Sequence, residues 1–150
     1  MRIVIQRVSE AAVRVDGEVL GQIGRGMMVL VGVEEGDTDE DCRWLAAKTA
    51  SLRIFDDENG VMNRSVKDEG GEILAISQFT LTASTRKGNR PSYIRAAGHE
   101  LATRLYEQYI SETSELLGRP TQRGRFGADM KVSLVNDGPV TIIIDSRLRE

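Results

Sequence analysis

Short apolar runs, separated by glycines and polar pairs, dominate the first third of the chain. Residues 3–8 and 12–15 have the composition of β-strands, and Asp16-Gly17 provides a two-residue hairpin signal before a further strand at residues 18–23. Residues 27–33 are apolar at almost every position, which is typical of a strand buried on both faces. The sequence therefore predicts that the chain begins with a meander of strands.

Two later segments have the spacing of amphipathic helices. Thr38 and Asp41 resemble a capping box, and apolar or small residues then recur at helical spacing up to Ile54. A second helix of about five turns is predicted over residues 101–117. Gly118 follows it, as expected at the end of a helix.

The remaining apolar runs, residues 72–78, 131–135 and 140–144, are predicted strands. Gly138-Pro139 lies between the last two and is predicted to form a hairpin corner. A length of 150 residues with 40% hydrophobic residues fits one domain with a sizeable core. The predicted fold is a single compact domain, 1–150, of the α/β class, rich in strands and α+β-like.

The chain shows no signal for a membrane or for secretion. No apolar stretch approaches the roughly 18 residues that a membrane-spanning helix requires. The first residues lack the apolar core and the small-residue cleavage site of a secretory signal. We therefore expect a cytoplasmic protein without a membrane partner.

Cys42 is the only cysteine and His99 the only histidine. One cysteine cannot form an intramolecular disulfide, and the pair cannot build a thiolate cage or a histidine-rich zinc centre. A Ser-His-Asp triad would have to use His99, whose position in the first turn of the second helix favours a solvated helix-start residue instead. We expect no metal and no cofactor.

The net charge of -3 conceals an uneven distribution along the chain. Residues 34–72 contain 12 acidic and 5 basic side chains, whereas residues 85–125 contain 8 basic and 4 acidic ones. Arg86, Lys87 and Arg90 lie in the basic stretch and are candidates for contacts with phosphates. The alternative on charge alone is an ordinary solvated surface.

Ser77-Gln78-Phe79-Thr80 interrupts an apolar strand at the point where a loop begins. One interpretation is a site in which a hydroxyl, an amide and free backbone N–H groups converge on a carbonyl, as an oxyanion requires. The alternative is a strand-end hydroxyl that bonds to its own backbone. Gly138-Pro139 taken alone is an ordinary turn, although Gly138 would allow another molecule to approach the backbone closely.

Several segments together closely resemble the D-aminoacyl-tRNA deacylase family, in order and over essentially the whole chain. Gln6-Arg7-Val8 near the start also resembles that family. The other matching segments are Ser77-Gln78-Phe79-Thr80-Leu81, residues 85–92, residues 124–130 and residues 136–141.

The resemblance implies a homodimer of three-layer subunits, with two β layers and one of helices, that hydrolyses the ester of D-aminoacyl-tRNA. It implies that Ser77, Gln78 and Thr80 line the pocket, and N–H groups near Phe79 and Thr80 could stabilise the oxyanion. Gly138-Pro139 would be held cis and would reach into the partner's pocket. Phe126, Ala128 and Met130 would border the terminal adenine, and Arg86, Lys87 and Arg90 would meet acceptor-stem phosphates.

If the Gly-Pro corner rejects an L side chain by steric clash, glycine has nothing to reject, so glycyl-tRNA should also be cleaved. The family role implied is chiral proofreading in translation. Two alternatives remain, a tRNA-binding protein without activity and a hydrolase of another small ester. Thr82-Ala83-Ser84 and Gly98-His99 depart from the family pattern, which leaves the substrate preference open.

Overall fold

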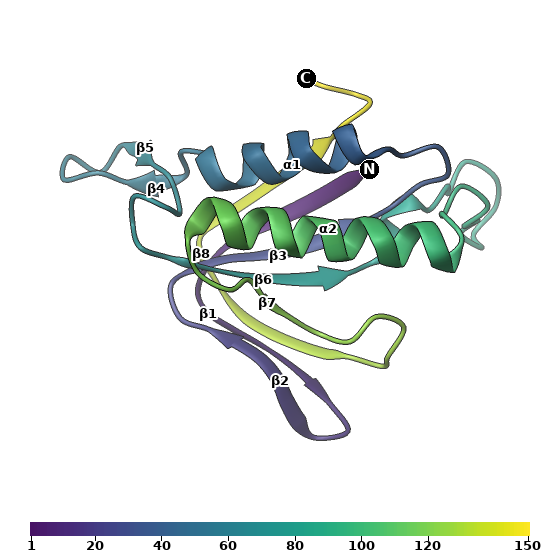
Figure 1. Cartoon of the computed structure of the whole chain (residues 1–150), viewed down its shortest axis with the longest axis horizontal. Helices are drawn as coiled ribbons and strands as arrows, with labels where there is room; N and C mark the ends of the chain where they lie inside the picture. The colour runs from purple at the N-terminus through teal and green to yellow at the C-terminus, as the bar shows by residue number, and fades with distance from the viewer.

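The computed structural model describes residues 1–150 as one sheet-based body with two helices on one face (Figure 1). The main sheet has the strand order β2-β1-β3-β6-β7, with β8 paired to β1, and β4 and β5 form a separate two-stranded sheet. The elements are β1 (Arg2–Val15), β2 (Glu18–Ile23), β3 (Gly26–Gly32), α1 (Asp39–Ser51), β4 (Phe55–Asp56), β5 (Met62–Arg64), β6 (Glu72–Ser77), the 3-10 turn η1 (Phe79–Thr82), α2 (His99–Leu117), β7 (Gln122–Arg123) and β8 (Lys131–Asp145).

Strands β3 and β6 pair in parallel and separate two hydrophobic cores. Alternate residues of a strand point to opposite faces, so Val29 and Ala75 enter the larger core beneath the helices, while Met28 and Leu74 enter the smaller core. The smaller core is closed by β2 and by the far halves of β1 and β8, which curve away from the helices in Figure 1. The fold therefore has the expected three layers, helices over two β layers.

Both predicted helices are confirmed. The Thr38 hydroxyl accepts a hydrogen bond from the Asp41 N–H, and the Asp41 carboxylate accepts one in return from the Thr38 N–H, which completes the capping box of α1. Helix α2 begins two residues before the predicted start and ends at Gly118, whose φ of 71° is easy for glycine. No helix is long and apolar enough to cross a membrane.

The prediction of a hairpin corner at Gly138-Pro139 is wrong. β8 is one continuous strand whose two halves both pair with β1, and the two predicted strands at residues 3–8 and 12–15 are likewise one strand. The ladder between the two strands is irregular where polar residues interrupt them: residues 137–140 of β8 stand opposite the single residue Arg7 of β1. The interruption is a bulge within a strand pair, not a reversal of the chain.

Candidate functional site

A cavity of about 280 Å³ opens at the carboxyl end of β6, on the same side as the start of α2. One wall comes from the end of β6 and the turn after it, and the other from the segment between β7 and β8. The cavity brings together six residues singled out from the sequence: Ser77, Gln78, Phe79, Phe126, Ala128 and Met130. These residues are about 50 positions apart in the chain, so only the fold could join them.

Apolar side chains of β3, β6 and α2 form the base of this cavity. Val31 and Ile76 come from the parallel strands, and Ala102 and Tyr106 come from the helix. The Tyr106 hydroxyl donates to the carbonyl of Ala75 at 2.8 Å, and burial raises the pKa of Tyr106 to about 12. Tyr106 is therefore neutral at physiological pH and braces the cavity wall.

Two backbone N–H groups of the turn η1 take no part in its turn hydrogen bonds. Gln78 N–H donates to the carbonyl of Val31 at 2.8 Å, which extends the parallel ladder one residue beyond β6. Leu81 N–H and Ala83 N–H then donate back to residues 78 and 80. No such turn bond uses the N–H of Phe79 or Thr80, which leaves both as candidate donors to a bound carbonyl oxygen.

Thr80 does not line this cavity. Its side chain accepts a hydrogen bond from the Gln78 amide at 2.5 Å and faces a separate groove that also contains Trp44 and Ile143. No ionisable group is hydrogen-bonded to the Thr80 hydroxyl. An unactivated hydroxyl is a weak nucleophile, so the geometry favours a positioning role for the Gln78–Thr80 pair.

Phe126 forms the outer wall of the cavity and contacts two other rings. Its ring lies 5.3 Å from that of His99, edge to face, and 6.0 Å from that of Tyr106. His99 itself is exposed in the first turn of α2, as the sequence predicted, and contacts the site only through this ring. A flat aromatic wall of this kind suits the stacking of a base.

Gly138-Pro139 is a cis peptide bond, as the resemblance implied, and it lies outside the cavity. Both residues are exposed on the bulge of β8. Gly138 has φ of 126°, and a Cβ atom there would lie 2.8 Å from the Arg7 side chain. The corner is thus exposed on β8 and does not line the cavity of its own chain.

Arg7 supports the Gly138-Pro139 bulge, a role that the sequence did not reveal, since Gln6-Arg7-Val8 was recognised only as a segment that resembles the family. Its side chain is only 10% exposed and donates from Nε to the carbonyl of Asp137 at 3.0 Å and from Nη1 to that of Ile54 at 2.8 Å. It therefore holds the backbone of the bulge at Asp137, the residue immediately before Gly138. Arg7 is the only charged residue of the predicted strand at residues 3–8, and this was the signal that could have revealed it.

The loop after η1 carries the predicted basic residues. Ser84 and Ser92 exchange two backbone hydrogen bonds, of 2.8 and 2.9 Å, which close the loop at its base. Arg86, Lys87 and Arg90 lie beyond this closure, all exposed and without a salt bridge. No group of three or more His, Cys, Asp or Glu side chains is placed to hold a metal ion.

Comparison with known proteins agrees with this architecture. A D-aminoacyl-tRNA deacylase of Parabacteroides distasonis is 59% identical over 150 residues, which cover all of both chains. A solved structure named c-Myc DNA unwinding element binding protein is 39% identical, with a TM-score of 0.92 over 97% of this chain and 98% of that one. A probable eukaryotic D-amino acid tRNA deacylase, 17% identical, shares the fold with a TM-score of 0.82 over 95% of this chain and 97% of the other.

The family model described as D-Tyr-tRNA(Tyr) deacylase matches residues 4–145, nearly the whole chain. This range includes the cavity, the basic loop and the Gly138-Pro139 bulge. The chain therefore belongs to the D-Tyr-tRNA(Tyr) deacylase family, hydrolases that cleave the ester bond of D-aminoacyl-tRNA.

Proposed function

We propose that the cavity is the aminoacyl-adenosine site of this deacylase and that it works in chiral proofreading during translation, in the cytoplasm. The observation that carries the proposal is the meeting of residues 77–79 with residues 126–130 in one cavity. The first segment offers backbone donors and an amide, and the second offers an aromatic wall. An aminoacyl ester on a terminal adenosine needs both.

The chemistry assigned to this site needs little more than positioning. An aminoacyl ester is already activated, so a water placed over its carbonyl carbon can attack it directly. As the carbon becomes tetrahedral, negative charge develops on the carbonyl oxygen, where the N–H groups of Phe79 and Thr80 would stabilise it. The C–O bond to the ribose then breaks, and the ribose oxygen takes the proton that the water loses; the neighbouring ribose hydroxyl can assist this transfer.

Selectivity for the D enantiomer is assigned to a Gly138-Pro139 corner supplied by a second copy of the chain. The corner projects from β8, whose outer edge is unpaired because β8 pairs only with β1. Val135 and Ile143 on either side of the bulge are 48% and 67% exposed, an unusual exposure for large apolar side chains. A homodimer through this strand would cover them and carry the corner to a partner.

In that dimer the carbonyls of Gly138 and Pro139 would hold the substrate's ammonium group. An L side chain would then point into the backbone and be rejected by steric clash. Glycine has no side chain to reject, so glycyl-tRNA is assigned as a second substrate. Arg86, Lys87 and Arg90, which have no partner within the chain, would contact phosphates of the acceptor stem.

The decisive experiment uses four labelled substrates: D-aminoacyl-tRNA, its L counterpart, glycyl-tRNA and a free D-amino acid ester. We expect loss of label from the D-aminoacyl-tRNA and glycyl-tRNA only. Cleavage of the L form would overturn the rejection model, and resistance of glycyl-tRNA would do the same. Cleavage of the free ester at a similar rate would favour the small-ester hydrolase, and tRNA binding without release would favour a binding protein.

A cavity-filling variant links the activity to this site. Ala128→Phe should reduce kcat/KM by at least about 100-fold, because the added ring occupies the space of the substrate. Ala47→Phe adds the same ring on the exposed face of α1 and should leave the activity unchanged. Equal activity of the two variants, at equal melting temperature, would place the reaction elsewhere.

A further inference from the structure

The turn η1 ends in carbonyl groups that are each held by a side chain. Arg2 donates from Nη1 to the carbonyl of Leu81 at 3.0 Å, and Arg95 donates from Nη2 to the carbonyl of Thr82 at 3.2 Å. The buried Thr82 hydroxyl donates to the carbonyl of Phe79 at 2.8 Å. The turn that presents the Phe79 and Thr80 N–H groups is therefore oriented by two guanidinium groups from outside it.

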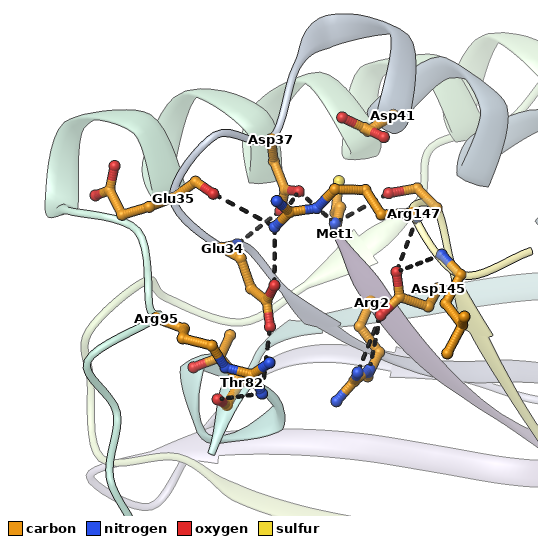
Figure 2. A network of polar contacts seen from close by, with 12 residues as sticks. Met1, Arg2, Glu34, Glu35, Asp37, Asp41, Thr82, Arg95, Asp145 and Arg147 are labelled. Carbon is orange, nitrogen blue, oxygen red and sulfur yellow. Dashed lines mark hydrogen bonds and ion pairs between the residues drawn. The ribbon is translucent and has the colours of Figure 1, made fainter. Parts of the chain in front are cut away.

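Arg95 is itself held by a network of charged side chains around the largely buried carboxylates of Glu34 and Asp37, which Figure 2 shows. Glu34 follows β3 and is 14% exposed; one carboxylate oxygen lies 3.7 Å from Arg95 Nη2, and the other lies 2.8 Å from Arg147 Nη2. Arg147 Nη2 also lies 3.1 Å from Asp37, whose carboxylate accepts a hydrogen bond from the Glu34 N–H at 2.6 Å. Glu34 thus lies between two guanidinium groups in a fixed place.

Arg95 also ends the basic loop that starts directly after η1. Its carbonyl accepts a hydrogen bond from the Glu35 N–H at 3.0 Å, so both its backbone and its side chain are fixed. The loop residues with unpaired positive charge, Arg86, Lys87 and Arg90, lie between η1 and this anchor. Both ends of the loop are therefore connected to η1: the loop starts directly after this turn, and Arg95 at its end donates a hydrogen bond to Thr82 in the turn.

We propose that Glu34 is a positioning residue for deacylation, acting through Arg95 on the turn η1. Without the carboxylate, the long Arg95 side chain loses the counter-charge that holds it over the Thr82 carbonyl and gains rotamer freedom. The turn then samples orientations in which its donors miss the oxyanion, and small misplacements of that kind have large effects on rate. The coupling to the basic loop rests on the proposed contact of that loop with tRNA.

Glu34→Gln is the test variant, because it removes the charge and keeps the shape. With D-aminoacyl-tRNA we expect kcat to fall about tenfold while KM changes less than twofold, since no substrate contact is removed. Glu18→Gln makes the same change on the exposed start of β2, where no salt bridge is lost, and should have no effect. Loss of kcat below twofold in Glu34→Gln, or an equal loss in Glu18→Gln, would overturn the proposal.

A double-mutant cycle distinguishes positioning from general destabilisation. Arg95→Met should lower kcat by a similar factor, and adding Glu34→Gln to it should cause no further loss, because the two residues act in series. Additive losses would mean that Glu34 does not act through Arg95. Arg95 is half exposed, so this variant should fold even if Glu34→Gln alone does not.

Hydrogen exchange of the backbone provides a measure that does not depend on activity. In Glu34→Gln, the hydrogen-bonded amides of Leu81, Ala83 and Ser84 should exchange at least about tenfold faster than in the original protein, while those of β6 stay protected. Unchanged exchange in the turn would overturn the proposal even if kcat fell. An inactive original protein would refute the proposed function, and the exchange result would still decide whether Glu34 holds the turn.

Discussion

Gly138 occupies a backbone position that has no space for a Cβ atom. Its φ of 126° is rare for residues with side chains, and an added Cβ would lie 2.8 Å from the Arg7 guanidinium and 2.9 Å from Val140. Arg7 is buried and already bonded to two carbonyls, so it cannot easily move aside. Gly138 and Arg7 together therefore define the backbone shape of the bulge.

We therefore expect Gly138→Ala to lower the free energy of unfolding by about 2–3 kcal/mol, from backbone strain and from the clash together. Gly17→Ala is the control, because Gly17 also has a positive φ, of 80°, but nothing lies within 4 Å of the added Cβ. It should lose only about 1 kcal/mol. Urea denaturation measures both values, and equal losses would show that the contact with Arg7 has no energetic weight.

An ion pair between Arg2 and Asp145 joins the start of β1 to the end of β8. Arg2 near the start of β1 donates from Nε to Asp145 at the end of β8, at 3.1 Å, and also holds the Leu81 carbonyl. Burial acts to raise the pKa of Asp145, but the N–H of Arg147, the positive N-terminus and Arg2 outweigh it and hold this pKa below its ordinary value. The pair links the long strands to the turn η1.

This depressed pKa predicts a pH dependence of stability. The contribution of Asp145 is fully present above the unfolded value of about 3.9 and is lost as the pH falls through the lower folded value. Asp145→Asn should therefore be less stable than the original protein by about 1–2 kcal/mol at pH 7, and the gap should close below about pH 3.9. A gap that does not narrow as the pH falls from 7 to 2, measured by urea denaturation, would contradict this origin; Asp129→Asn, at an exposed position, should show no gap.

The sequence predicted regular elements better than their connections. The capping box at Thr38 and the glycine after α2 are local signals, so both helices were predicted within a few residues of their ends. Gly-Pro is also a local signal for a turn, but here long-range pairing with β1 keeps the chain straight through it. A local pattern could not show that pairing.

The prediction of the site residues was limited in the same way, because the fold decides where their side chains lie. The family resemblance pointed to both walls of the cavity, although they are far apart in sequence. It could not show that the Thr80 side chain faces the neighbouring groove, because the 3-10 turn after β6 decides that direction. Arg7 was missed because its two acceptors, at Ile54 and Asp137, lie far from it in the chain.

The whole molecule has one long strand edge without a partner, on β8. Its exposed Ile143 borders the groove that contains Trp44 and Thr80, on the side of the molecule that the proposed dimer would cover. Apolar side chains exposed along an open strand edge favour association with another chain. The second subunit is thus proposed from surface chemistry as well as from the needs of the site.

Ile143→Asp should convert the proposed dimer into a monomer, because a carboxylate would have to be buried without a partner. Deacylation should fall at least about 100-fold with it, since each site would lose the Gly138-Pro139 corner of the other chain. Val19→Asp places the same charge on an exposed apolar position of β2 and should leave both properties intact. Sedimentation velocity measures the mass, and an active monomer would contradict a shared site.

The groove beside β8 also contains a fluorescent side chain that responds to its surroundings. Trp44 is the only tryptophan of the chain, and it lies in that groove with the Arg149 guanidinium 4.2 Å from its ring centre. Burial of an indole against a second subunit changes its emission, and every other residue is silent at the wavelengths that excite tryptophan alone. Dissociation of the proposed dimer would therefore change the intrinsic fluorescence, which can be followed at dilutions where chromatography fails and with no dye attached.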